Sequence, residues 1–161
     1  MKKIIFLDRD GVLNREIGNY VMSPEELEIL PGRIDALKRL KAQGYCFVIV
    51  TNQGGIAKGL YSHEGLKQIH NKLEKHFANE GITFEAIYYS PHHQDFGASL
   101  DRKPGSLMVE KGLARFKAKA EDCYLIGDSP RDIEAAAAAG VKGIKITANE
   151  PLDEALSEIL R

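Results

Sequence analysis

Two aspartates, Asp8 and Asp10, stand two residues apart at the end of a short apolar run, in the stretch FLDRDGVLN. Carboxylates this close repel each other, so a chain that keeps both needs a nearby positive charge or a use for the pair. Asp8 could attack a phosphorus atom and form an aspartyl phosphate, while Asp10 transfers protons as general acid and then as general base. Arg9 is expected on the opposite side of an extended backbone, because side chains alternate along a strand. The pair is therefore suited to phosphoryl transfer, although a DxD sequence on its own can also form a simple turn.

Polar residues suited to the same chemistry follow later apolar runs: Thr51 in TNQGG, Lys103 in RKPG, and Asp128 with Asp132 in GDSPRD. Each cluster alone is ordinary loop or helix-start composition. Together, Asp8 and Asp128, with a backbone carbonyl near Asp10, would hold Mg²⁺, which offsets the repulsion between a carboxylate and a phosphate. Lys103 and the Thr51 hydroxyl would contact the transferring oxygens. A contribution of Asp132 to the metal site stays open.

Apolar runs at five places predict β-strands, at 2–8, 45–52, 84–90, 122–128 and 143–147. They are nearly continuous in apolar character, which is typical of strands covered on both faces. Helical periodicity predicts helices at 32–44, 63–80, 105–118, 130–140 and 150–161. This alternation predicts an α/β fold, a doubly wound parallel sheet with helices on both faces, in which residues 1–161 form a single domain.

Three polar stretches, 9–31, 52–62 and 90–104, are too long or too polar for simple connections, and each begins where a predicted strand ends. The carboxyl ends of parallel strands meet at one edge of the sheet, and open α/β sheets bind their ligands there. We therefore expect these stretches to surround one site at that edge.

Charge and composition limit the partners of the chain. Lys and Arg number 22 against 23 Asp and Glu, and this balance gives no electrostatic reason to expect nucleic acid or an anionic membrane. No apolar run approaches the roughly 20 residues that span a bilayer, and the amino-terminal stretch is charged too early for a signal peptide. Cys46 and Cys123 are expected to be free buried thiols. We expect a cytoplasmic monomer with a small-molecule substrate.

The motifs DRDGVLN, TNQGGIAKG, RKP and GDSPRD, in this order, resemble the four signature motifs of the haloacid dehalogenase (HAD) superfamily of phosphatases. DRDG with TNQ and an SPHH…RKP loop is similar to the branch that contains histidinol-phosphate and D-glycero-D-manno-heptose 1,7-bisphosphate phosphatases. The resemblance covers essentially the whole chain and implies a Rossmann-like core. The short segments between the motifs imply a core without a cap domain, so that the loops at 14–22 and 90–102 would recognise the substrate.

The resemblance also implies roles for single residues. Asp8 would be the nucleophile, Asp10 the acid and base, and Asp128 a Mg²⁺ ligand. Thr51 and Lys103 would bind the phosphate. Further substrate contacts would come from Asn14, Glu16, Tyr20, Asn52, Gln53 and Arg102. The implied activity is Mg²⁺-dependent hydrolysis of a small phosphorylated sugar, with heptose 1,7-bisphosphate, converted to heptose 1-phosphate, as the first choice.

The loop before RKP departs from the pattern of the branch. Zinc-bearing members carry a Cys-x-His and a Cys-x-Cys pair there, and the corresponding positions in this chain are Ser90, His92, Ser99 and Asp101. Without thiolates these side chains make a poor tetrahedral zinc site, so we expect no structural zinc. The loop would then depend on its own packing, for example on Phe96. His92 and His93 would order the loop, contact substrate or simply be solvated.

The sequence also allows other functions. Histidinol phosphate is the second candidate substrate, because the same motifs serve both activities. A polynucleotide 3′-phosphatase would need a basic surface along the nucleic acid, which the charge balance disfavours. A non-catalytic phosphate-binding module would be expected to have lost at least one of the chemical groups, yet all of them are present.

Overall fold

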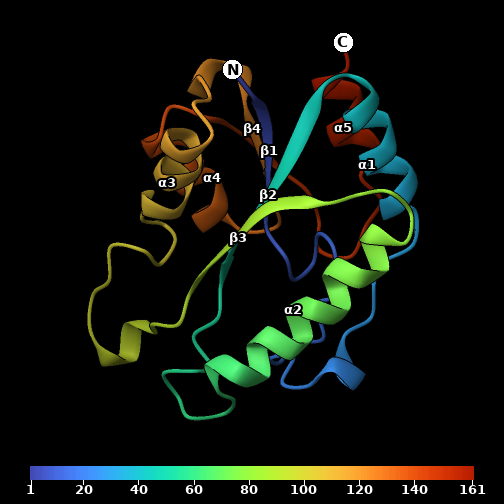
Figure 1. The fold of residues 1–161 in the computed structure, drawn as a ribbon. Helices are drawn as coiled ribbons and strands as arrows, with labels where there is room; N and C mark the ends of the chain where they lie inside the picture. Colours follow the sequence, from blue (N-terminus) through green and yellow to red (C-terminus); the bar gives the residue numbers. More distant parts are fainter.

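The five apolar runs form one parallel sheet in the computed structural model, which describes all residues from 1 to 161. The strands are β1 (Lys3–Leu7), β2 (Tyr45–Asn52), β3 (Phe84–Ser90), β4 (Tyr124–Gly127) and β5 (Lys142–Lys145), in the spatial order β3-β2-β1-β4-β5 (Figure 1). All neighbouring pairs are parallel. β1, which precedes the aspartate pair, is the central strand.

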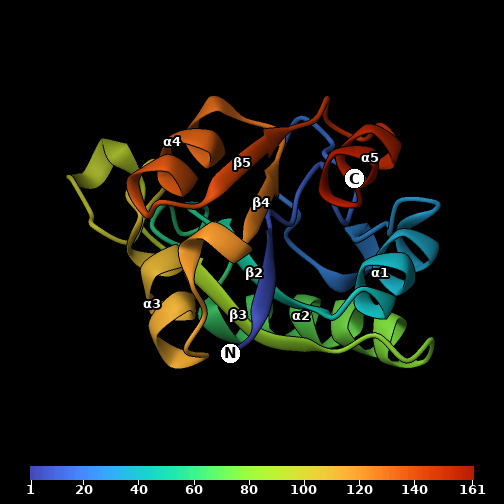
Figure 2. The same ribbon diagram turned by 90° about the horizontal axis from the view of Figure 1, so that it is seen from above.

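Helices cover both faces of this sheet. They are α1 (Arg33–Ala42), α2 (His63–Ala78), α3 (Leu107–Arg115), α4 (Pro130–Ala138) and α5 (Asp153–Ile159). The larger core cluster joins α1, α2 and α5 to one face, and the smaller cluster joins α3 and α4 to the other. Figure 2 shows α3 and α4 on one side of the strands and α1 and α5 on the opposite side.

Alternation along β1 explains the two clusters. Ile5 and Leu7 belong to the larger cluster, whereas Ile4 and Phe6 belong to the smaller one, because successive side chains of a strand point to opposite faces. All four are fully buried. The predicted doubly wound α/β fold is therefore confirmed, with strand and helix bounds close to those expected. None of the helices combines the length and the apolar character that a membrane crossing requires.

The three polar stretches leave the carboxyl ends of β1, β2 and β3 and lie together at the lower end of the sheet in Figure 1. Each was predicted as irregular, and short 3-10 helices at Pro24–Glu26 and Gln94–Phe96 interrupt two of them. A single turn of this kind has no periodicity that a sequence pattern could reveal.

A buried arginine ties the first of these stretches to the rest of the fold. The Arg33 guanidinium donates to the backbone oxygens of Val12 at 2.7 Å, Pro31 at 3.1 Å and Glu150 at 2.6 Å. Asn149 adds a reciprocal pair of hydrogen bonds with the backbone of Glu16, at 2.7 and 3.0 Å. The segment after the aspartate pair is thus fixed against the carboxyl-terminal part of the chain.

Candidate active site

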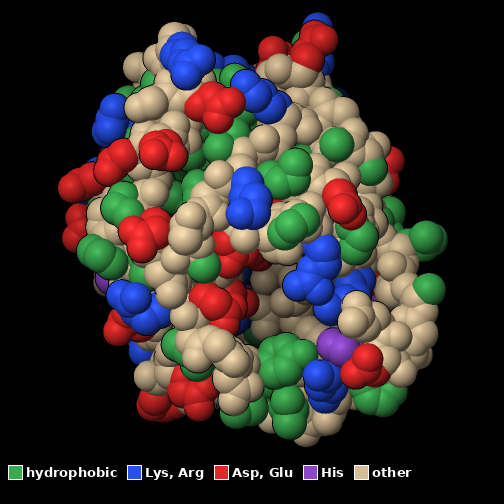
Figure 3. All heavy atoms as spheres, turned by 180° about the vertical axis from the view of Figure 1, so that it is seen from behind, with side chains coloured by type: hydrophobic (Ala, Val, Ile, Leu, Met, Phe, Trp, Pro, Cys, Tyr) green, Lys and Arg blue, Asp and Glu red, His purple; other side chains and the backbone are tan.

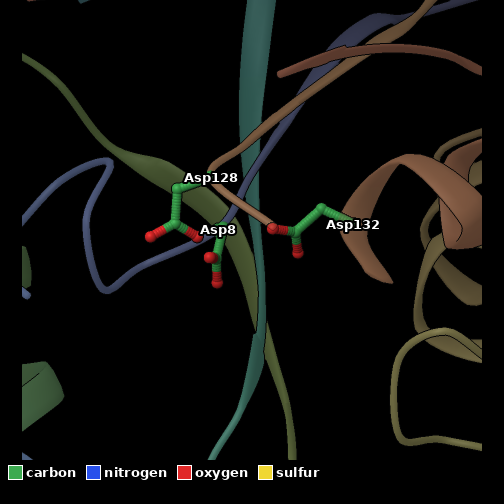
Figure 4. A group of neighbouring side chains, drawn as sticks. All are labelled: Asp8, Asp128 and Asp132. Carbon is green, nitrogen blue, oxygen red and sulfur yellow. The ribbon is translucent and has the colours of Figure 1, made fainter. Parts of the chain in front are cut away.

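Three carboxylates meet at the carboxyl edge of the sheet. Asp8 follows β1, Asp128 follows β4, and Asp132 lies in the first turn of α4. One oxygen atom of each lies within 4.8 Å of those of the others (Figure 4). Lys103 Nζ donates to Asp8 Oδ1 at 3.0 Å, to Asp132 Oδ1 at 2.5 Å and to the backbone oxygen of Val50 at 2.9 Å. The only cation buried in this cluster is therefore fixed directly beside Asp8.

The backbone at the end of β1 creates the space around these groups. The Asp8 amide donates to the Ile126 oxygen at 3.0 Å, so the contact between β1 and β4 extends by one residue. Gly11 then adopts a φ of 85°, a left-handed conformation that favours glycine. A Cβ atom at Gly11 would lie 2.2 Å from Asp128 Oδ2. Any larger residue at this position would collide with the carboxylate.

Burial and like charge act together on these carboxylates. Burial raises the pKa of Asp8 well above its usual value, Lys103 opposes this effect, and Asp132 and Asp128 add to it. Burial likewise raises the pKa of Asp128. Burial alone would lower the pKa of Lys103, but Asp8 and Asp132 raise it, so Lys103 stays protonated. The cluster has more negative than positive charge, and its oxygen donors fit Mg²⁺.

Asp10 lies outside this cluster in a different environment. Its Oδ1 accepts from Arg9 Nη2 at 2.8 Å and from Asn14 Nδ2 at 2.9 Å, and its Oδ2 accepts from Gln53 Nε2 at 3.1 Å. Burial raises its pKa, but the charge and the hydrogen bonds of these donors outweigh that effect and leave the pKa below its usual value. The pKa values of the two neighbouring aspartates are thus shifted in opposite directions, upward for Asp8 and downward for Asp10.

Two adjoining cavities open over these residues. The inner one, of about 270 Å³, is lined by Asp8, Asp10, Lys103, Asp128 and Asp132, among others. The outer one, of about 390 Å³, shares Asp10, Glu16, Asn52 and Arg131 with it and extends to the 14–22 and 90–102 loops. Figure 3 shows a hollow with acidic side chains on one side and basic side chains with a histidine on the other. A ligand can therefore reach both cavities at once.

Comparison with known proteins agrees with this geometry. Residues 11–146 match the family model of haloacid dehalogenase-like hydrolases. The chain belongs to this family. The D-glycero-beta-D-manno-heptose-1,7-bisphosphate 7-phosphatase of Pasteurella multocida is 35% identical over 160 residues, 96% of this chain and 86% of that protein. The enzyme of the same name from Bordetella bronchiseptica is 39% identical over 138 residues, 86% of this chain and 76% of that protein.

Solved structures of HAD phosphatases have the same fold as this chain. A crystal structure of D,D-heptose 1,7-bisphosphate phosphatase from B. bronchiseptica, complexed with magnesium and phosphate, has a TM-score of 0.85 and 36% identity. The match covers 97% of this chain and 86% of that one. A putative HAD-like phosphatase from Mesorhizobium loti, at 22% identity and a TM-score of 0.87, shares the fold. The predicted enzyme class, a phosphatase of the HAD superfamily, is confirmed.

The expected substrate contacts of this HAD chain divide into two groups. The outer cavity is lined by Glu16, Tyr20, Asn52, Gln53 and Arg102. Asn14 and Thr51 are buried and line neither cavity, so their expected contacts with the substrate and the phosphate stay predictions. Asn14 donates to Asp10, and the Thr51 hydroxyl accepts from Gln53 Nε2 at 2.9 Å.

Asn52 connects the motif after β2 to the one that carries Lys103. Its side chain donates to the Lys103 oxygen at 3.1 Å and accepts from the Lys103 amide at 2.9 Å. This reciprocal pair fixes the backbone on which the lysine reaches Asp8. Asn52 therefore has a positioning role in addition to its place in the wall of both cavities.

The prediction for Arg9 was wrong. Its side chain is fully buried and donates to Asp10 instead of pointing away from the site. Strand alternation ends with β1 at Leu7, because the next residues form a tight turn in which the Arg9 oxygen accepts from the amides of Leu13 and Asn14. The guanidinium also lies 3.1 Å from His70 Nε2 on α2, an interaction between residues 61 positions apart.

Of the four positions that correspond to zinc ligands, three lie around the carboxylate of the fourth, Asp101. Ser90 Oγ and Ser99 Oγ donate to Asp101 Oδ1 at 2.8 and 2.5 Å, and His92 Nε2 lies 3.8 Å from Asp101 Oδ2. The Asp101 oxygens are used by hydroxyl groups, and no thiolate is present, so these residues do not fit zinc. Hydrogen bonds to Asp101 thus connect the two ends of the loop. The expectation that Phe96 anchors the loop is wrong, because 68% of its surface is exposed.

Two residues with a place in the site were not predicted from the sequence: Arg131 lines both cavities, and Tyr61 Oη donates to Gln53 Oε1 at 2.6 Å. His93, for which substrate contact was one of the expected roles, lines the outer cavity. The position of Arg131 inside GDSPRD was the only available signal, because that motif begins at the end of a strand. Nothing in the pattern around Tyr61 distinguished it from a loop aromatic.

The buried histidine gives a testable pH dependence. Burial and the charge of Arg9 lower the pKa of His70 from 6.5 to about 3. Between these values the unfolded chain binds a proton that the folded chain excludes, so the free energy of unfolding falls as the pH falls through this window. In His70→Gln this contribution disappears, and the difference in slope should approach about 1.4 kcal/mol per pH unit. Urea unfolding of both proteins from pH 6.5 to 4.5 measures it, and equal slopes would contradict a neutral buried His70.

Proposed function

We propose that this protein is a Mg²⁺-dependent phosphomonoesterase that hydrolyses D-glycero-D-manno-heptose 1,7-bisphosphate to heptose 1-phosphate. The observation that carries the proposal is the position of Asp8, with Lys103 at 3.0 Å and Asp128 beside it, at the base of a cavity that continues to Arg102 and Arg131. The heptose 1,7-bisphosphate phosphatases that this chain resembles make the same substrate class the first choice.

The first chemical step is attack by an Asp8 carboxylate oxygen on phosphorus. An O–P bond to Asp8 forms, the P–O bond to the sugar breaks, and the electron pair of that bond goes to the leaving oxygen. Lys103 places positive charge beside the attacking carboxylate and the transferring oxygens. Mg²⁺ bound by Asp8 and Asp128 would reduce the repulsion between the carboxylate and the phosphate and stabilise the developing charge.

Proton transfer is the task of Asp10. In the first step its protonated carboxyl gives a proton to the leaving sugar oxygen. In the second step its carboxylate takes a proton from a water molecule, whose oxygen attacks the aspartyl phosphate and releases phosphate from Asp8. The lowered pKa of Asp10 favours the carboxylate form that the second step needs, and the first step therefore uses the less populated protonated form.

The charge of the outer cavity supports a substrate with a second phosphate. Arg102 and Arg131 both line it, and burial together with the charge of Arg131 lowers the pKa of Arg102. Two close guanidinium groups facing one hollow suit an additional anion. Histidinol phosphate, the alternative from the sequence, has one phosphate and a cationic amino group at its other end, which these arginines would repel.

A panel of phosphate-release assays with Mg²⁺ tests the proposal. It compares both anomers of heptose 1,7-bisphosphate with histidinol phosphate and a 3′-phosphorylated oligonucleotide. We expect the highest kcat/KM for one heptose bisphosphate anomer and no measurable release from the oligonucleotide. A higher kcat/KM for histidinol phosphate would replace the proposed substrate, and no release from any compound would refute the phosphatase assignment.

Replacement of Arg102, which lines the outer cavity but not the inner one, should affect a bisphosphate more than a monophosphate. Charge-assisted hydrogen bonds contribute about 1.5–3 kcal/mol, so Arg102→Met should raise KM for heptose 1,7-bisphosphate roughly 10- to 100-fold. KM for heptose 7-phosphate should change less than about threefold, because its single phosphate occupies the inner cavity. Lys119→Met, at an exposed position that lines neither cavity, serves as the control, and equal changes for both substrates would contradict the second phosphate site.

The proposal also covers the oligomeric state, the cellular location and the partners of the protein. We infer a cytoplasmic monomer that acts on a small phosphorylated sugar and has no nucleic-acid or membrane partner, in keeping with a net charge of -1. Light scattering should give a mass near 17.8 kDa. A mass twice as large at micromolar concentration would overturn the monomer.

A further inference from the structure

A buried side-chain relay connects helix α2 to Asp10. Arg9 is fully buried, and its guanidinium has two side-chain partners: Asp10 Oδ1, at 2.8 Å from Nη2, and His70 Nε2, at 3.1 Å from Nη1. Its Nε atom has no hydrogen-bond partner. The orientation of the guanidinium therefore depends on these two contacts, one on each side.

His70 is suited to accept a hydrogen bond from Arg9. It is 5% exposed, and the centroid of its ring lies 6.1 Å from that of Tyr89 in an edge-on arrangement, which limits rotation of the imidazole. Two cations at this distance in buried surroundings would repel strongly, so the imidazole is neutral and Nε2 is the acceptor. Without this acceptor, Arg9 would keep a single side-chain partner and could turn away from Asp10.

We propose that His70 is a positioning residue for proton transfer, because it fixes the Arg9 guanidinium in the orientation that holds the Asp10 carboxyl group against the leaving oxygen of the substrate. This role rests on the proposed phosphatase function. His70 itself does not line either cavity over the carboxylates and touches no reacting atom. Its effect passes through Arg9, while Asn14 and Gln53 retain their own bonds to Asp10.

The consequence depends on the leaving group. A sugar hydroxyl is a weak acid, so its oxygen needs a proton from Asp10 as the P–O bond breaks. p-Nitrophenol is a far stronger acid, and its anion leaves without a proton. Because kcat/KM reports all steps up to departure of the leaving group, a misplaced Asp10 lowers kcat/KM for the sugar phosphate and spares that for p-nitrophenyl phosphate.

Matched replacements at His70 test this role. His70→Asn and His70→Gln both introduce a neutral amide, but only the longer glutamine can place its oxygen where Nε2 lies. We expect His70→Asn to lower kcat/KM for heptose 1,7-bisphosphate about 10- to 100-fold, part of the 10²- to 10⁴-fold contribution of a general acid. With p-nitrophenyl phosphate the loss should be less than about threefold. With His70→Gln, kcat/KM for heptose 1,7-bisphosphate should stay within about threefold of the wild-type value.

Controls separate this role from damage to the fold and from failure of the proposed function. His76→Asn, at an exposed position on the same helix, should leave both substrates unaffected. Equal losses of kcat/KM on both substrates, no loss with His70→Asn, or no rescue by glutamine would overturn the positioning role while wild-type activity stands. Absence of wild-type activity on both phosphates would instead refute the phosphatase function, and this role with it.

Discussion

Asp8→Asn will abolish phosphate release while the protein remains folded. An amide nitrogen or oxygen at this position cannot form the phosphoryl linkage, so turnover should fall by at least about 10⁴-fold, since loss of a nucleophile in a comparable covalent mechanism costs on the order of 10⁶-fold. The substitution preserves shape and removes one negative charge from a cluster in which neighbouring carboxylates raise the pKa of Asp8. Lys103 keeps its bonds to Asp132 and to the Val50 oxygen. We therefore expect a melting temperature no lower than that of the wild type.

The measurement combines activity with detection of the intermediate. Acid quenching of the wild type during turnover of ³²P-labelled substrate should trap a phosphorylated protein, and the variant should trap none. Asp35→Asn, an exposed aspartate in the first turn of α1, is the matched control and should retain full activity. Turnover by Asp8→Asn within tenfold of the wild type would refute the aspartyl phosphate mechanism.

The convergence of Asp8, Lys103 and Asp128 could be predicted from the sequence because it follows from two general rules. Apolar runs covered on both faces predict parallel strands, and the carboxyl ends of such strands meet at one edge. Asp8 and Asp128 stand directly after β1 and β4, which are neighbours in the sheet. Lys103 comes from a loop, yet the short motif RKP places it after β3 at the same edge. No knowledge of side-chain contacts is needed for any of these steps.

The environment of Asp10 could not be predicted in this way. Arg9 was expected to point away because the alternation rule applies only while the backbone stays extended, and β1 ends at Leu7. His70 and Gln53 approach from other elements, and their distances in sequence carry no periodic signal. Contacts of this kind are set by tertiary packing of single side chains. A pattern of residue types identifies which groups can do chemistry, but it does not show which neighbours tune them.

The loop around Asp101 is a second case in which the sequence did not reveal the side-chain contacts. Because the loop lacks thiolates, the sequence predicted that its own packing holds it, for example through an aromatic side chain. The structure shows two serine hydroxyls on one carboxylate instead, with Phe96 exposed. Hydroxyl groups are so common in loops that their composition does not reveal which of them converge. Only the path of the folded chain determines whether serine hydroxyls or an aromatic side chain hold the loop.

Removal of divalent cations will also abolish activity, and Mg²⁺ alone will restore it. After treatment with EDTA and exchange into metal-free buffer, phosphate release should fall at least about 10³-fold, because the anionic nucleophile and the anionic phosphate then approach without charge compensation. Mg²⁺ should also raise the melting temperature of the metal-free protein, since a ligand that binds only the folded state stabilises it by mass action. This second readout does not depend on catalysis.

Asp128→Asn identifies the ligands of that cation. The variant keeps Asp8 and Lys103 but loses one carboxylate of the cluster, so it should need at least about tenfold more Mg²⁺ for half-maximal activity and show a smaller rise in melting temperature. Glu121→Gln, an exposed acid before β4, should behave as the wild type. A requirement for added zinc would contradict the hydrogen-bonded loop around Asp101. An unchanged Mg²⁺ response in Asp128→Asn would show that the metal does not bind at the carboxylate cluster. Lys103 would then be the only positive charge that offsets the repulsion between Asp8 and the phosphate.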